Sequence, residues 1–119
     1  MLLNFSNHPS EKWSAKQRET AESEYSKIVD MPFPNIPPDM SSHKVQEVAE
    51  NFYRTIANIS EPKHLTIHIM GEMTFVYKIV QLFQRSGFTC IASTSERKTI
   101  DNADGTKTVL FEFVRFRSY

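Results

Sequence analysis

Cysteine is nearly absent from this chain of 119 residues, because Cys90 is the only one. No disulfide can form within the chain, which excludes a small scaffold held together by disulfides. Cys90 lies in the apolar run "FTCIAS". Nothing near it in sequence would lower the pKa of its thiol, so we interpret Cys90 as a reduced core residue rather than a nucleophile.

The chain also lacks net charge and long apolar runs. Fourteen basic residues balance fourteen acidic ones, so a polyanion would have to be bound by a local cluster of charge. This balance disfavours nonspecific binding to DNA. No apolar run approaches the roughly 18 residues of a membrane span, and the first ten residues do not resemble a signal peptide. We therefore expect a cytoplasmic protein without a membrane partner.

Cofactor and metal motifs are missing as well. The sequence contains neither G-x-G-x-x-G nor G-x-x-x-x-G-K-[ST], so dinucleotide binding and P-loop chemistry have no support. The four histidines do not have ligand spacing and no Cys/His cluster exists; they are His8, His43, His64 and His68. We expect neither a metal site nor a cofactor.

What the chain does have is enough apolar residues for one core. With 39% apolar residues and nine Phe, residues 1–119 predict a single domain. Short β-prone runs alternate with amphipathic segments along the sequence. The patterns predict strands at 2–6, 27–31, 64–70, 88–95 and 108–118, and helices at 14–25, 42–59 and 74–87. The proline-rich stretch 32–40 predicts an extended loop.

This element order predicts an α/β fold, a small Rossmann-like domain. We expect a mostly parallel five-stranded sheet with helices on both faces. The dipeptide Asp104–Gly105 is a strong hairpin signal, so the C-terminal strand should be antiparallel to its predecessor. Alternation along that strand places Phe111 and Phe113 on one face and Phe116 on the other.

The stretch "TIHIMGEMTFVYKIV" passes from a predicted strand to a predicted helix at Gly71 and Glu72. In parallel sheets, ligands bind beyond the carboxyl ends of the strands, where helix N-termini present free N–H groups. Gly71 would let the backbone approach a ligand, and the amides of Glu72, Met73 and Thr74 would form an anion seat.

Other polar turns should meet at the same edge. We expect one cleft to contain these residues: Ser6, Asn7 and His8 after the first strand, and Ser93, Thr94, Ser95, Glu96 and Arg97 after the fourth. Each also has a plain structural reading. Glu72 could serve only the helix dipole, Gly71 only a tight turn, and His8 could be an ordinary loop residue. Trp13 could anchor its helix or stack on a base.

Four segments together resemble a family of small stand-alone proteins encoded beside type III CRISPR systems. These segments are "LLNFSNHPSEKWSAKQ", "IVDMPFP", "HIMGEMTFVYKIVQLFQRSGFTCIASTSER" and "FEFVRFRSY", and they cover most of the chain. The resemblance implies a ring nuclease, which opens the cyclic oligoadenylate messengers of antiviral signalling. It also implies a Rossmann-like fold assembled as a homodimer, with the site in the loops at Asn7–His8, Gly71–Glu72 and Ser95–Arg97.

Such an enzyme needs only the attack of a ribose 2′-hydroxyl on the adjacent phosphorus, without a metal. Positioning and charge stabilisation dominate this reaction. His8 has the pKa range to move a proton, Glu72 could orient His8 or bind the substrate, and Arg97 could hold the phosphate. Two alternatives remain open: a sensor or sponge that binds a cyclic nucleotide without cutting it, and a structural interaction partner with an empty cleft.

Overall fold

The computed structural model describes residues 1–119 as an α/β fold with one mixed five-stranded sheet. The strands are β1 (Leu2–Ser6), β2 (Ile28–Asp30), β3 (Thr66–Met70), β4 (Thr89–Asp101) and β5 (Lys107–Ser118), in the order β2-β1-β3-β4-β5. β1 pairs in parallel with β2 and β3, and β3 pairs in parallel with β4. β5 is antiparallel to β4, as predicted.

The helices begin where the sequence supplies caps. They are α1 (Ala15–Tyr25), α2 (Ser42–Ala57) and α3 (Met73–Arg85), with short 3-10 helices η1 (Ser10–Lys12) and η2 (Pro62–His64). Ser14 caps α1, and its Oγ accepts a hydrogen bond from the amide of Gln17 at 3.2 Å. The prediction that the second helix extends to Ile59 is wrong, because α2 ends at Ala57 and Ile59 is exposed. None of these helices has both the length and the apolar character that a membrane crossing requires.

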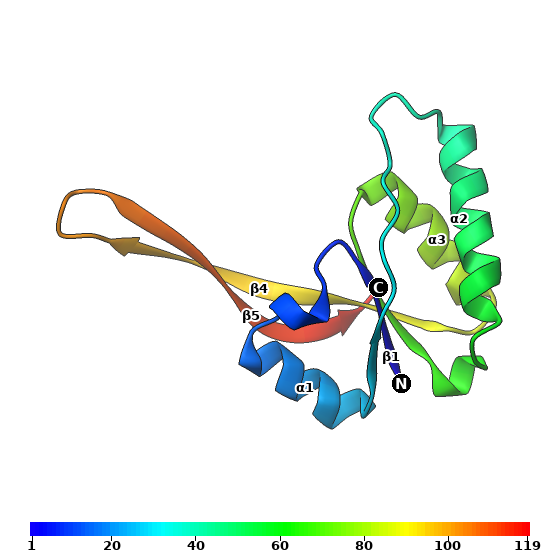
Figure 1. Ribbon diagram of the computed structural model, residues 1–119, viewed down its shortest axis with the longest axis horizontal. Coiled ribbons are helices and arrows are strands. Elements are labelled where there is room, and N and C mark those ends of the chain that lie inside the picture. Colours follow the sequence, from blue (N-terminus) through cyan, green and yellow to red (C-terminus); the bar gives the residue numbers. More distant parts are fainter.

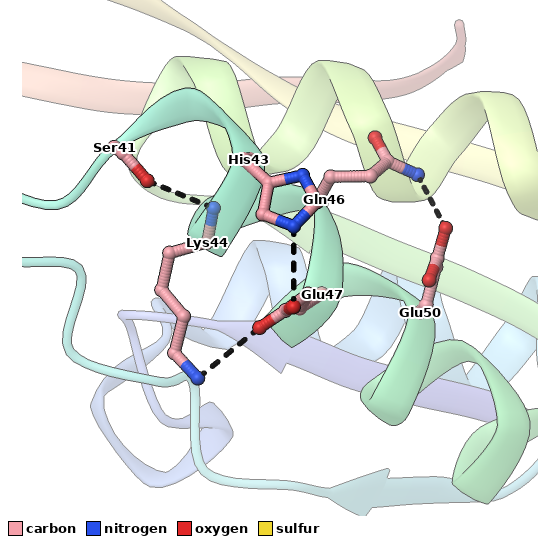
Figure 2. A network of polar contacts seen from close by, with 6 residues as sticks. All are labelled: Ser41, His43, Lys44, Gln46, Glu47 and Glu50. Carbon is pink, nitrogen blue, oxygen red and sulfur yellow. Dashed lines mark hydrogen bonds and ion pairs between the residues drawn. The ribbon is translucent and has the colours of Figure 1, made fainter.

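Helix α2 separates a polar surface from an apolar stripe. Ser41 Oγ caps it by accepting from the Lys44 amide at 3.1 Å (Figure 2). On the exposed side, Glu47 contacts both His43 and Lys44 at 3.3 Å, in pairs three and four residues apart (Figure 2). Such exposed pairs each contribute only about 0.2–0.5 kcal/mol. Packing of the buried stripe, which includes Val45, therefore has to hold α2 on the sheet.

The helices cover both faces of the sheet, as predicted. On one face, α2 and α3 pack against Leu3, Phe5, Ile67 and Ile69 in a cluster of fifteen buried residues. Helix α1 lies on the other face (Figure 1). It covers a smaller cluster of six residues: Leu2, Trp13, Ala21, Ile91, Phe113 and Phe116. The predicted core thiol is confirmed, because Cys90 is buried in the larger cluster, where burial raises its pKa to about 12.

The final hairpin is much longer than the sequence predicts. β4 does not end at Ser95 but continues to Asp101, and with β5 it forms a twisted two-stranded ribbon that projects from the body (Figure 1). The turn holds Gly105 at φ +85°, which confirms the hairpin signal. Residues 95–101 are exposed and, apart from Ile100, polar, so their pattern resembles a loop. Backbone pairing with β5, supported by an exposed Lys98–Glu112 ion pair, makes them a strand instead.

A β-bulge changes the faces of β5. Thr94 pairs with Arg115 and Ser95 pairs with Phe113, so Val114 is the extra residue. The strict alternation predicted for this strand is therefore wrong: Phe113 and Phe116 are both buried on the α1 face. Phe111, in contrast, is 69% exposed.

Candidate functional site

The loops that follow β1 and β3 meet at one edge of the sheet. The amide of Asn7, just after β1, donates a hydrogen bond to the carbonyl of Met70, the last residue of β3, at 3.2 Å. This contact confirms the expectation that the carboxyl ends of these strands bring His8 and Gly71 to the same end of the sheet. β4 has no loop at this edge, because its chain continues into the ribbon.

A cavity of about 640 Å³ opens at this edge on the α1 face of the sheet. Its wall comes from the β1–α1 segment, from the end of β3 and from the base of the ribbon. The lining residues are Ser6, Asn7, His8, Lys12, Trp13, Ser14, Lys16, Gln17, His68, Met70, Ser93, Thr94, Ser95, Phe111, Glu112 and Phe113. The cavity thus combines aromatic rings, hydroxyl groups and two exposed lysines, while its one carboxylate, Glu112, is paired with Lys98 at 2.9 Å. These groups suit a ligand with flat rings and negative charge.

The backbone of His8 is held firmly while its side chain stays exposed. The carbonyl of His8 accepts hydrogen bonds from Asn4 Nδ2 at 3.0 Å and from Trp13 Nε1 at 3.1 Å. Its amide donates to Ser6 Oγ at 3.2 Å. The imidazole forms no such bond within the chain, so it is positioned at the cavity wall and free to contact a ligand.

A chain of polar groups runs beneath the cavity, from the exposed Asp30 to the buried Asn4 and His68. Asp30 Oδ1 accepts from Asn4 Nδ2 at 2.7 Å, and Asn4 Oδ1 lies 2.8 Å from Nδ1 of His68. Burial opposes ionisation of Asp30, but hydrogen bonds from Ser10 and Asn4 lower the pKa of its carboxyl group. Burial, with a smaller contribution from the charge of His8, lowers the pKa of His68 to about 4. The His68 ring is therefore neutral at physiological pH.

Glu72 occupies part of the predicted anion seat with its own carboxylate, which binds the Thr74 amide of that seat and the neighbouring Phe75 amide. Its Oε2 accepts from the Phe75 amide at 2.8 Å and from the Thr74 hydroxyl at 2.6 Å, and its Oε1 accepts from the Thr74 amide at 3.2 Å. The hydrogen bond from the Thr74 hydroxyl, followed by that from the Phe75 amide, lowers the pKa of Glu72. Glu72 is the N-cap of α3, which leaves these amides without capacity for a ligand.

Gly71 is explained by packing. A Cβ at this position would overlap with Cζ of Phe33, far inside van der Waals contact. The Phe33 ring belongs to the proline-rich loop and packs on Phe5 and Phe75. Glycine is therefore required here by an aromatic ring of the chain itself, and the expected approach of a ligand is not needed to explain it.

The predicted site residues divide among three places. Ser6, Asn7, His8 and Ser95 line the main cavity. Gly71 and Met73 line a more apolar groove along α3, and Glu72 and Thr74 line a depression beside the proline-rich loop. Glu96 and Arg97 lie on the exposed ribbon, outside these cavities, so the expected Ser95–Arg97 turn is wrong. His8 and Glu72 thus line different cavities.

Sequence reasoning missed the polar face of the central strands. Asn4 and Ser6 alternate with Leu3 and Phe5 in β1, and Asn4 pairs in register with His68 of β3. All five residues are buried. Polar residues at alternate positions of two otherwise apolar strands were the available signal, because such residues share one face of a sheet. Lys12 and Lys16 were missed because only η1 and the first turn of α1 bring them to this face.

The site offers no metal-binding constellation. Nowhere in residues 1–119 do three or more His, Cys, Asp or Glu side chains gather closely enough to hold an ion. The polar groups at the cavity are mainly hydroxyls, amides and lysines, which bind organic and anionic ligands rather than metals.

Comparison with known proteins identifies a family but no activity. No curated protein and no solved structure matches the chain. A family model matches residues 1–117, which is nearly the whole sequence, and its description is "Uncharacterized protein MJ1673 family". The chain, with its mixed five-stranded sheet and the cavity at the end of β1 and β3, belongs to this MJ1673 family.

Proposed function

We propose that this protein is a ring nuclease that binds a cyclic oligoadenylate in the main cavity and opens it, switching off type III antiviral signalling. The observation that carries the proposal is the composition of one cavity. Aromatic side chains suited to stack on adenine, Trp13 and Phe111, line it together with two lysines suited to bind phosphates and the exposed imidazole of His8.

A Rossmann-like fold is part of the proposal. The order β2-β1-β3-β4 is the order of doubly wound parallel sheets, in which helices leave neighbouring strands toward opposite faces. Here α1 follows β1 on one face, and α3 follows β3 on the other. Ligands of such sheets bind at the crevice between these two strands, and the cavity opens there.

The proposed reaction breaks one phosphodiester bond in the ring. The ribose 2′-oxygen bonds to the adjacent phosphorus, the bond from phosphorus to the 5′-oxygen breaks, and the products are a 2′,3′-cyclic phosphate and a 5′-hydroxyl. The 2′-hydroxyl loses a proton and the 5′-oxygen gains one, so the balance needs no further reactant. His8 would accept or donate this proton, and Lys12 and Lys16 would offset the phosphate charge.

Binding without cleavage, as in a sensor or sponge, is the second candidate. It is favoured by the groups that are missing from the cavity. Arg97 lies on the ribbon, and Glu72 occupies the Thr74 and Phe75 amides at the start of α3, so the two exposed lysines are the main groups in the cavity that can stabilise negative charge. Two flexible lysines can hold a phosphate, but they stabilise a transition state less well than fixed donors.

A homodimer would suit a symmetric ring, because each subunit of a two-fold pair offers the same cleft. The ribbon is the candidate surface. Val109, Leu110 and Phe111 of β5 are exposed, and β5 is the edge strand of the sheet. A second copy packed on the ribbon would also lie beside the cavity, since Phe111 lines it.

The test is to incubate the purified protein with cyclic tri-, tetra- and hexa-adenylate and to resolve the products by chromatography, with binding measured by calorimetry. A linear product ending in a 2′,3′-cyclic phosphate supports the nuclease, and retention without cleavage supports the sensor. The double variant K12Q/K16Q should bind at least about tenfold more weakly. Lys63→Gln on η2, which does not line the cavity, is the matched control. If the chain neither binds nor cleaves any ring, both functions are excluded.

A further inference from the structure

His68 is a buried histidine at the floor of the cavity, and only one of its two ring nitrogens has a hydrogen-bond partner. It lies in the middle of β3, is 1% exposed and belongs to the cavity wall. Its Nε2 is the one buried side-chain nitrogen or oxygen in the chain without a hydrogen-bond partner. Buried polar atoms are rarely left unpaired, because the loss of water is then not compensated.

The surrounding hydrogen bonds determine which nitrogen of His68 carries the proton. Asn4 Nδ2 donates both to Asp30 Oδ1, at 2.7 Å, and to the carbonyl of His8, at 3.0 Å. The Oδ1 atom of Asn4 must then be the group that faces His68, and it can only accept. Nδ1 of His68 therefore carries the hydrogen, and Nε2 presents a lone pair as a pure acceptor.

The neighbours of His68 favour a flat ligand. Trp13 and Phe116 lie edge-to-face with the imidazole, with ring centroids at 5.4 and 5.6 Å. A phosphate would be repelled by a lone pair in this aromatic setting, and the lysines that could bind it lie at the exposed side of the cavity. A heteroaromatic ring with an N–H at its rim satisfies both the apolar wall and the lone pair.

We propose that His68 Nε2 accepts a hydrogen bond from the exocyclic amino group of an adenine seated in this cavity, and so makes the site selective for adenine. This inference rests on the proposed function, since it takes the base from the cyclic oligoadenylate. Met70 lies two residues further along β3 on the same face and lines the cavity. Nε2 is buried, so a base can reach it only if lining side chains shift, and the unbranched, half-buried side chain of Met70 is suited to do so.

The experiment combines a change in the ligand with a change in the protein. Binding of cyclic tetra-adenylate is compared with binding of the same ring made from purine riboside, which lacks only the amino group. Wild-type protein should prefer the adenine ring by about 10- to 100-fold, the range expected for a hydrogen bond that leaves a buried partner unpaired. His68→Phe keeps a flat ring and removes the acceptor, so it should bind both rings equally. His43→Gln, on the exposed side of α2, should keep the wild-type preference.

A second measurement does not depend on a variant that folds. Wild-type protein with ¹⁵N-labelled histidine is titrated with adenosine monophosphate and with the cyclic rings, and the Nε2 signal of His68 is followed by NMR. A shift with adenine compounds but not with purine riboside supports the inference, even if no ring is cleaved or bound. If the cyclic adenylate binds without moving the signal, or if both rings bind equally well, the inference fails and the proposed function stands. If no adenine compound binds, both fail.

Discussion

Acidification should destabilise this fold through His68. In the folded chain the pKa of this residue falls from 6.5 to about 4, because burial disfavours the charged ring and the charge of His8 adds to the effect. The unfolded chain therefore binds a proton that the folded chain does not. Stability from the neutral ring is complete above pH 6.5, is lost as the pH falls toward 4, and is constant below that.

The magnitude follows from the shift. One pKa unit corresponds to about 1.4 kcal/mol, so between about pH 7 and pH 4.5 the free energy of unfolding should fall by about 2 kcal/mol through this residue alone. Asp30 acts at lower pH, because its pKa lies below 3.8. Between pH 6.5 and 4, the effect of His68 on stability can therefore be distinguished from that of this neighbouring carboxyl group.

The assay is urea unfolding of wild type and His68→Phe at a series of pH values across this window. Phenylalanine occupies a similar volume, and Asn4 Oδ1 keeps a donor in Ser6 Oγ at 2.7 Å. The difference in stability between the two proteins should change by about 2 kcal/mol in favour of the variant as the pH falls. His43→Gln should follow the wild-type curve. Parallel curves for wild type and His68→Phe would refute the reasoning, because some other group would then carry the pH dependence.

Three further substitutions test the site. His8→Ala should slow cleavage of the ring by about 10²-fold. The free energy of unfolding should change by less than about 1 kcal/mol, because the side chain is exposed. Cleavage at the wild-type rate would remove His8 from the mechanism. Glu72→Ala should cost about 1 kcal/mol of stability, because α3 loses its N-cap, and should leave the rate of cleavage unchanged. A clear loss of rate in the folded variant would show that Glu72 takes part in the reaction. Gly71→Ala should destabilise the fold by about 1–3 kcal/mol, because the new Cβ meets the Phe33 ring. Adding Phe33→Leu should restore part of the lost stability, measured by thermal unfolding. If stability is not restored, the Phe33 ring is not what excludes a side chain at position 71.

Local signals determined the elements of the fold and their order. The helical pattern over 14–25 predicted α1, and the Asp104–Gly105 turn predicted the antiparallel hairpin. These features depend on residues within a few positions of one another, so they can be read from sequence alone. Alternation of strands and helices likewise indicated parallel pairing of the first four strands.

The faces and the site depended on contacts between distant segments. Residues 95–101 are polar enough for a loop and become a strand only because β5 pairs with them, while one extra residue at Val114 turns Phe113 and Phe116 to the same side. Phe33 lies far from Gly71 in the sequence but next to it in the fold, and so explains a glycine that local reasoning assigned to a ligand.

The candidate site divides in the same way, into features that local sequence determines and features that depend on contacts between distant segments. Sequence alone placed Ser6, Asn7 and His8 at the carboxyl end of the first strand and predicted that the loops after the first and third strands share one edge. Only the folded chain paired Asn4 with His68, which are 64 positions apart, and left one buried nitrogen without a partner. Periodicity reports which side of an element is apolar, but the register between strands and the burial of a polar atom arise only when the elements pack together.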